Sequence, residues 1–374
     1  MRILQLAGRA GDGTCGVADH TFHLSCALAK SADVVLVHRE GSEPLPEYRR
    51  VEDCGRVELQ PLSGFELGRL NELIALINAG EADVVHLQYP AAEYRFSLLP
   101  VNLARHRGLL KRAALVVTLH EYHAAHPLRR MAARRLHAAA DACILPSTRD
   151  YAQLAKSRWK RKLHQIPDGN FFGPALKGEE ATSYCDRMPA VCYFGLPSKT
   201  KDARWLFELF AQLRRTVPEL KLKLVGGVSP RGVAALTRRL GLVGQVESAG
   251  FLPLPELRAE VERTLLAAFP FSFDTHRSSL INALSFRTPI VCAGVEPEVR
   301  RLYAPELPLQ VANPQSAREV SVVQGYLKAA SADFGLAASG HLVAQSKLGA
   351  RLAMGKIAAA HLEVYNHVLN ARNA

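Results

Sequence analysis

The stretch "GRAGDGTCGVADHTFHLSCALAK", residues 8–30, sets the fold class of the first half of the chain. It follows the apolar run "RILQLA" (2–7), and its glycines at positions 11, 13 and 16 spell G-x-G-x-x-G. A second apolar run, "DVVLVHRE" (33–40), comes next and ends in an acidic residue. This order of strand, glycine-rich turn, helix, strand and acidic residue matches the dinucleotide-binding fingerprint in outline. The loop therefore binds either a nicotinamide or flavin cofactor or another phosphate-bearing ligand.

Length and composition favour a soluble globular protein with two cores. The chain has 374 residues, of which 48% are hydrophobic and 22% charged, and single cores stop growing near roughly 250–300 residues. The opening apolar run is too short for a signal peptide, and no run reaches the roughly 18 residues of a membrane helix. We therefore expect a cytoplasmic location.

Positive charge gathers in the first half of the chain. The formal net charge is +12, and basic residues cluster in "RHRGLLKR" (105–112), "RRMAARR" (129–135) and "KSRWKRK" (156–162). Such clusters suit anionic phosphates, nucleic acid or an acidic membrane surface. No motif for binding nucleic acid accompanies them, so nucleic acid is not an expected partner. Peripheral docking on an anionic membrane and plain solvated helix faces remain two open interpretations.

The cysteines and histidines show no metal-binding spacing. Seven cysteines are scattered without a C-x-x-C pair, and fourteen histidines include no H-E-x-x-H motif. We expect the cysteines to be small buried apolar residues without a disulfide framework, and we expect no metal site.

Strand-like and helix-like segments alternate through both halves, a pattern typical of parallel sheets covered on both faces. The polar segment that separates the halves predicts a linker. We expect an N-terminal Rossmann-like domain, a linker, a C-terminal Rossmann-like domain and a returning helix, at residues 1–172, 173–188, 189–350 and 351–374. Two doubly wound domains predict a ligand cleft where the carboxyl ends of both sheets face each other.

Candidate phosphate-binding residues follow strands of the second half. Lys201 lies in "FGLPSKTKDARW" (194–205), after a strand and before a helix. Arg277, Ser278 and Ser279 begin another helix, where backbone N–H groups, hydroxyls and a guanidinium would form a diphosphate cradle. The alternative for Ser278 is a simple helix N-cap.

In the first half, the glycine loop is longer than the dinucleotide fingerprint requires, because Gly8 ends the strand and Gly11 follows only after Arg9 and Ala10. His120 in "TLHEYH" (118–123) also follows a strand, at a position where parallel sheets bind ligands.

Together these segments resemble the retaining glycosyltransferases of family 4, which have the GT-B fold. The resemblance covers nearly the whole chain. It is carried by "CGVADHTFHLSCAL" (15–28), "DVVHLQYP" (83–90), "VVTLHEYH" (116–123), "IPDGNFF" (166–172), "FGLPSKTKDARWLFELFAQL" (194–213), "LKLVGG" (222–227), "AGFLPLPEL" (249–257), "RSSLINALSFRTPIVCAG" (277–294) and "IAAAHLEVY" (357–365).

The resemblance implies that residues 1–172 form the acceptor-binding domain and residues 189–350 the nucleotide-sugar-binding domain. It also implies a role for each candidate residue. His120 would touch the transferred sugar, and Lys201 would neutralise the leaving diphosphate beside Gly195 and the Arg277–Ser279 segment. The loop of Gly13, Cys15 and Gly16 would lie beside the sugar-phosphate and the acceptor, and Gly226, Gly250, Phe251, Leu252 and Asn282 would hold the ribose and base. The resemblance implies a UDP- or GDP-linked sugar as substrate, with no cofactor and no metal.

Two departures from the family pattern leave a second function open. Asp274 and Asn282 occupy positions where the family usually has glutamates, and Leu196 replaces a usual arginine, a charge that Arg277 would supply. The main hypothesis is a retaining glycosyltransferase acting on a glycan, glycolipid or small-molecule hydroxyl. The alternatives are a catalytically weak sugar-nucleotide-binding subunit of a polysaccharide assembly system and, third, an NAD-dependent oxidoreductase.

Overall fold

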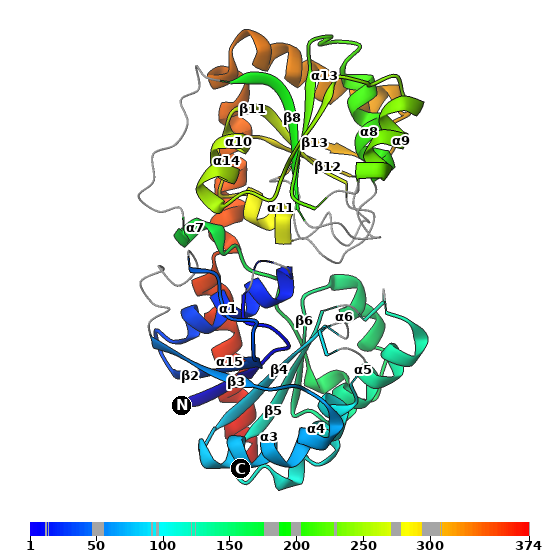
Figure 1. Ribbon diagram of the computed structural model, residues 1–374. Helices are drawn as coiled ribbons and strands as arrows, with labels where there is room; N and C mark the ends of the chain where they lie inside the picture. The colour runs from blue at the N-terminus through cyan, green and yellow to red at the C-terminus, as the bar shows by residue number, and fades with distance from the viewer. Residues whose placement is uncertain are drawn as a thin grey trace. The chain divides into compact units, whose positions relative to one another are not determined.

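The fold was analysed in a computed structural model, which describes residues 1–11, 13, 15–46, 56–90, 93–94, 97–120, 122–123, 125–175, 187–195, 203–227, 230–270, 278–293, 307 and 309–373. The chain forms two compact units. The N-terminal unit comprises Met1–Phe171 together with Leu352–Ala374, and the C-terminal unit comprises Phe172–Arg351. The C-terminal helix therefore belongs to the N-terminal unit (Figure 1).

The N-terminal unit is a parallel sheet of seven strands in the order β3-β2-β1-β4-β5-β6-β7. Each strand is followed by a helix or loop that returns to the start of the next strand, as in doubly wound folds. Its elements are β1 (Arg2–Leu6), α1 (Gly16–Leu28), β2 (Asp33–Arg39), β3 (Val57–Leu62), η2 (Leu67–Arg69), α3 (Leu70–Ala79), β4 (Val84–Tyr89), α4 (Leu99–Arg105), η3 (Arg107–Leu109), β5 (Ala114–Leu119), α5 (Pro127–Ala139), β6 (Ala142–Leu145), α6 (Thr148–Leu154), η4 (Lys160–Lys162), β7 (Leu163–Gln165) and α15 (Met354–Asn373).

The C-terminal unit is a parallel sheet of six strands in the order β10-β9-β8-β11-β12-β13. Its elements are α7 (Phe172–Ala175), β8 (Met188–Phe194), α8 (Ala203–Leu213), β9 (Lys221–Val225), α9 (Pro230–Arg239), β10 (Val246–Gly250), α10 (Leu254–Glu262), β11 (Thr264–Phe269), α11 (Ser278–Ala283), β12 (Ile290–Ala293), β13 (Leu309–Val311), α13 (Ala317–Ala332) and α14 (Phe334–Arg351). Two Rossmann-like domains of parallel strands are the fold class that the sequence predicts. In both units the chain order reverses beside a central strand, β1 in the first and β8 in the second.

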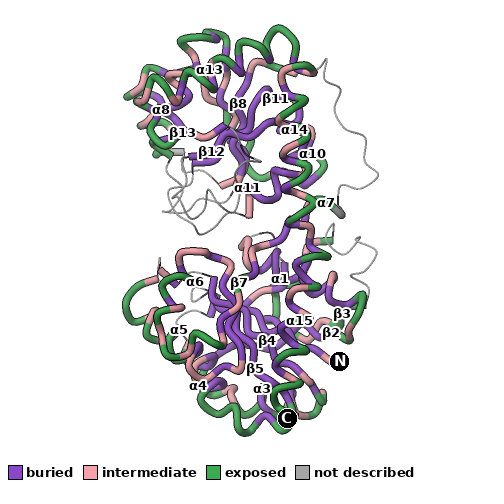
Figure 2. The backbone as a smooth tube through the Cα atoms, turned by 180° about the vertical axis from the view of Figure 1, so that it is seen from behind, coloured by how far each residue is buried: buried purple, intermediate pink, exposed green. Residues whose placement is uncertain are grey.

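Central strands of both sheets are buried along their length, whereas helices expose their outer sides (Figure 2). In the N-terminal unit, one face of the sheet packs an apolar cluster against α3, α4, α5 and α6, with Leu6, Leu87 and Val117 at its centre. The opposite face lies under α1 and α15, which contact each other. The helical face of α15 that includes Ile357, His361 and Tyr365 is buried, in agreement with the amphipathic pattern in its sequence.

One expectation about the cysteines is wrong. Cys143, Cys192 and Cys292 are free and buried, as small apolar residues would be, but Cys26 is disulfide-bonded. The spacing of cysteines in the sequence does not give their distance in space, which alone decides whether a disulfide can form.

Candidate functional site

A row of polar side chains crosses the buried face of the N-terminal sheet that lies under α1 and α15. Strands buried on both faces are usually apolar throughout. Here alternate positions of three neighbouring strands are polar and at most 7% exposed, namely Gln5, His86, Gln88, Thr118 and His120. Buried polar groups of this kind are costly unless they are hydrogen-bonded, so the row requires a structural or functional explanation.

His120 ends this row, directly after β5. Its Nε2 lies 2.8 Å from Oε1 of Gln88, and its Nδ1 lies 3.9 Å from Oδ1 of Asp168. Its ring meets the ring of His20, on α1, edge to face at a centroid distance of 6.1 Å. The structure thus brings the predicted histidine against the helix that follows the glycine loop. Asp168, in "IPDGNFF", is a neighbour that the sequence analysis did not single out.

The glycine loop takes a conformation that its glycines make accessible. Gly13 has a φ of +72°, and a Cβ at this position would lie 2.7 Å from Cδ1 of Leu45. Its N–H donates to Oδ1 of Asp19 at 3.0 Å. Helix α1 begins at Gly16, with Cys15 as its N-cap residue. The loop is therefore fixed at the carboxyl end of β1, where the sequence predicts a ligand-binding turn.

Cys15 connects this loop to the loop that follows β4. Its thiol donates to Oε1 of Glu93 at 2.7 Å, and Glu93 is 6% exposed. Burial, and next the Glu93 carboxylate, raises the pKa of the Cys15 thiol, so the side chain is a neutral hydrogen-bond donor. Arg39, at the end of β2, donates to the main-chain oxygen of Glu93 at 2.9 Å. Sequence reasoning missed Glu93, although its place shortly after a central strand is a signal that could have found it.

The buried histidines of α1, α15 and β4 are uncharged at neutral pH. Burial lowers the pKa of His20 to about 4 and, together with the charge of His20, that of His23 to about 3. Burial also lowers the pKa of His361 to about 4 and holds that of His86 well below its ordinary value. Each imidazole is thus one donor and one acceptor in this face of the sheet.

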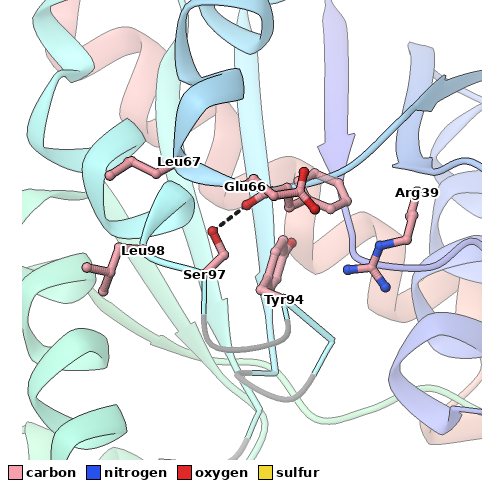
Figure 3. Close-up of a pocket in the computed structure, with 7 residues that line it drawn as sticks. Arg39, Glu66, Leu67, Tyr94, Ser97 and Leu98 are labelled. Carbon is pink, nitrogen blue, oxygen red and sulfur yellow. Dashed lines mark hydrogen bonds between the residues drawn. The ribbon is translucent and has the colours of Figure 1, made fainter.

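A small pocket opens at the carboxyl ends of β2, β3 and β4 (Figure 3). Its volume is about 270 Å³, and it is lined by Arg39, Phe65, Glu66, Leu67, Tyr94, Ser97 and Leu98. The Ser97 hydroxyl donates to the main-chain oxygen of Phe65, and the Arg39 guanidinium lies 5.9 Å from the centre of the Phe65 ring. Leu67 and Leu98 are about half exposed, at 49% and 56%. The pocket is thus lined by aromatic rings, apolar side chains and charged groups.

In the C-terminal unit, three predicted glycines converge where β8, β9 and β10 end. Gly195, Gly226 and Gly250 all have positive φ, at 142°, 104° and 69°. The N–H of Gly226 donates to the oxygen of Gly250 at 2.5 Å, and a Cβ on Gly226 would lie 2.6 Å from the oxygen of Gly195. These three positions carry no Cβ, so their backbone is open to close approach by a ligand.

The other predicted donor residues fall into two groups. Phe251 is 63% exposed directly after β10, and Leu252 is half-buried. Ser278 and Ser279 begin α11, and the Ser279 hydroxyl is buried without a partner among the described residues. Asn282 is 2% exposed, and its Oδ1 accepts from the N–H of Phe172 at 3.4 Å. Lys201, Asp274, Arg277 and Leu196 lie outside the described residues.

Two further observations concern metals and membranes. Within the part of the chain that the structure describes, no three or more His, Cys, Asp or Glu side chains are grouped so that they could hold a metal ion. None of the helices in that same part has the length and apolar character needed to cross a membrane.

Two models of known protein families match consecutive parts of the chain. Residues 14–169 match the model of Glycosyltransferase Family 4, and residues 188–316 match that of Glycosyl transferases group 1. The chain belongs to the family 4 glycosyltransferases. Curated protein sequences contain no match to this glycosyltransferase.

Solved structures with the same fold cover almost the whole of this glycosyltransferase. Anabaena HepE, crystallised with UDP and glucose, is 19% identical with a TM-score of 0.72 over 98% of this chain and 100% of its own. Sucrose-phosphate synthase from Thermosynechococcus elongatus is 16% identical with a TM-score of 0.68 over 99% and 100%. A glycosyltransferase from Rickettsia africae is 13% identical with a TM-score of 0.72 over 98% of each chain. At these identities the likeness shows the GT-B fold.

Proposed function

We propose that this glycosyltransferase moves a sugar from a UDP- or GDP-linked donor to a hydroxyl of a glycan, glycolipid or small molecule, with retention of configuration and without a metal ion. The observation that carries the proposal is the match of each unit to one of the two glycosyltransferase models, in chain order. HepE, which has the same fold, was crystallised with UDP and glucose.

The proposed chemistry assigns charge stabilisation to the C-terminal unit. When the bond from the sugar to the diphosphate breaks, negative charge develops on the leaving group, and Lys201 and Arg277 supply positive charge to it. The buried Ser279 hydroxyl has no partner among the described residues, which supports a diphosphate site at the start of α11. The close approach of Gly226 to Gly195 supports the neighbouring site for the ribose and base. In the N-terminal unit, His120 contacts the transferred sugar, and attack on the face of departure gives retention.

The test is a thermal-shift screen of UDP-, GDP-, ADP- and dTDP-sugars beside NAD and NADP, on the wild type and on Lys201→Ala. A ligand at 100 times its Kd stabilises by about 2.7 kcal/mol. We expect a shift with one sugar nucleotide that is lost in Lys201→Ala. A shift with NAD alone would contradict the proposal, and added EDTA should leave the sugar-nucleotide shift unchanged if no metal is required.

A second candidate, a sugar-nucleotide-binding subunit with weak catalysis, is favoured by Asn282. This residue replaces a usual glutamate, is almost fully buried, and already accepts a hydrogen bond from the N–H of Phe172. Hydrolysis of the bound donor without acceptor separates the two candidates, because a binding subunit gives the thermal shift and no turnover. Restoring the acid with Asn282→Glu should raise hydrolysis only if the second candidate is correct.

For the acceptor side we propose peripheral contact with an anionic membrane through α5. Leu128 and Met131 are 65% and 45% exposed, and Arg135 is exposed at the same helical face. Exposed apolar side chains beside cations favour binding to acidic lipid surfaces. Arg107 and Arg112, in another basic cluster, form ion pairs within the fold, with Asp141 and Asp83 respectively.

Co-sedimentation with vesicles of anionic or neutral lipid tests this contact. We expect salt-sensitive binding to anionic vesicles that Leu128→Asp weakens. The matched control is Leu336→Asp, at a site in the C-terminal unit that is 77% exposed. Equal binding to neutral and anionic vesicles would exclude an electrostatic membrane contact.

A further inference from the structure

The polar row under α15 is one continuous hydrogen-bonded array that ends at His120. Its five links join side chains of β1, β4, β5 and α15, and every member is at most 7% exposed. The links are Thr118 Oγ1 to His86 Nε2 (2.7 Å), His86 Nδ1 to the Tyr365 hydroxyl (2.6 Å), that hydroxyl to Gln5 Nε2 (3.4 Å), Gln5 Oε1 to Gln88 Nε2 (3.3 Å), and Gln88 Oε1 to His120 Nε2 (2.8 Å).

The donors and acceptors in this array all point the same way. Gln88 gives its amide hydrogen to Gln5, so its oxygen faces His120 and can only accept. Gln5 likewise donates to the Tyr365 oxygen, which leaves the Tyr365 proton for Nδ1 of His86. A neutral imidazole has one donor and one acceptor, so His86 then donates from Nε2 to Thr118. The very low pKa of His86, caused first by burial, keeps that ring neutral.

Among the residues that the structure describes, two acceptors lie near the ring nitrogens of His120. Gln88 Oε1 is 2.8 Å from Nε2, within hydrogen-bond distance, whereas Asp168 Oδ1 is 3.9 Å from Nδ1, beyond it. With the array intact, the nearer acceptor prevails and the proton lies on Nε2. If Gln88 turned its amide or lost its oxygen, the carboxylate of Asp168 would favour the proton on Nδ1.

We propose that Gln88 and Tyr365 are positioning residues that hold His120 in the tautomer protonated on Nε2. Tyr365 acts from α15, 245 positions after His120, through Gln5 and Gln88. The returning C-terminal helix thus sets which nitrogen of His120 donates and which accepts. That this tautomer matters for sugar transfer rests on the proposed function, whereas the tautomer itself does not.

Two-bond ¹⁵N–¹H correlation spectra of histidine-labelled full-length protein test the tautomer directly, with His120→Gln used to assign the signal. We expect Nε2–H in the wild type, Nδ1–H in Gln88→Leu, and a mixture in Tyr365→Phe. Tyr122→Phe is the matched control, because it removes another fully buried tyrosine hydroxyl of the same unit, one that accepts from Arg134 instead of joining the array. Nδ1–H in the wild type, or unchanged Nε2–H in Gln88→Leu, would overturn the proposal.

Donor hydrolysis, measured on the same variants, tests the consequence for catalysis. We expect Tyr365→Phe to lower kcat about tenfold with little change in KM, because a misplaced catalytic group affects the reacting geometry, and we expect Tyr122→Phe to keep the wild-type rate. If Tyr365→Phe does not fold, both the spectra and the hydrolysis rate are measured on Gln88→Leu. A wild type without turnover on any donor counts against the proposed function alone, since the spectra still decide the tautomer.

Discussion

Gly226 is placed where no other residue fits without strain. Its φ is +104°, and a Cβ would come within 2.6 Å of the main-chain oxygen of Gly195. A main-chain oxygen cannot rotate away as a flexible side chain would. The close approach of the β8 and β9 ends, which forms the proposed donor edge, therefore depends on this one residue.

We predict that Gly226→Ala lowers the free energy of unfolding by about 3 kcal/mol, the upper end of the cost of a strained backbone residue. The control is Gly241→Ala, where φ is +66° but nothing lies within 4 Å of a Cβ. In this variant only the left-handed conformation is unfavourable, which lowers the free energy of unfolding by about 1 kcal/mol. Urea unfolding of both variants measures the difference, and equal losses would show that contact with Gly195 costs nothing.

Individual site residues differ in how far the sequence predicts them. His120 and Gly226 could be singled out because each follows an apolar run, and ends of parallel strands are where ligands bind. Gly250 was singled out only through the family resemblance, because its strand is polar and mostly exposed. Glu93, Asp168 and Gln88 were missed. Gln88 lies inside a buried strand, and its role appears only once Tyr365 is packed against the same sheet face, a contact that no local pattern encodes.

At the scale of elements, helix α1 is unusual in burying two histidines. His20 and His23 are each 4% exposed, and His23 stacks on Phe171 at a centroid distance of 4.8 Å. Burial depresses the pKa of both, so the folded chain stays unprotonated there while the unfolded chain binds protons below about pH 6.5. Stability is therefore full above pH 6.5 and falls as the pH drops toward 4.

We predict that each such histidine costs about 2 kcal/mol of stability between pH 7 and pH 5. Between pH 7 and pH 5, His23→Phe should therefore lose about 2 kcal/mol less stability than the wild type loses. This difference does not depend on how the substitution changes the stability at pH 7. His106→Gln, at an exposed position, is the control variant. Urea unfolding at both pH values measures it, and an identical loss in His23→Phe would show that His23 titrates normally in the fold.

Strands were predicted best where they are most buried. The apolar run 84–89, within the quoted "DVVHLQYP", coincides with β4, all of whose residues are buried. Strands β3 and β13 were missed because they are sheet edges, where β3 is partly exposed and carries Pro61, so no continuous apolar run marks them. Helices α13 and α14 were also missed, since they follow each other without an intervening strand.

At the scale of the whole molecule, the two units differ in how the chain builds them. The C-terminal unit is one continuous segment, whereas the N-terminal unit needs both ends of the chain. Helix α15 contributes Ile357, Val364, Tyr365 and Val368, each at most 5% exposed. Burying each such side chain contributes about 1.5–3 kcal/mol, so their sum is comparable to the 5–15 kcal/mol that stabilises a typical domain.

We therefore predict that residues 172–351 fold alone, whereas residues 1–171 do not unfold cooperatively unless a peptide of residues 352–374 is added. The peptide supplies both the missing apolar surface and the Tyr365 hydroxyl that bonds to His86. Far-UV circular dichroism through a thermal scan, with and without peptide, measures this. A peptide carrying Tyr365→Ala should restore folding much less well, while one carrying the exposed change Asn366→Ala should match the natural sequence. A sharp transition of residues 1–171 alone would mean that the first sheet is stable without the helix, and that α15 serves the site rather than the fold.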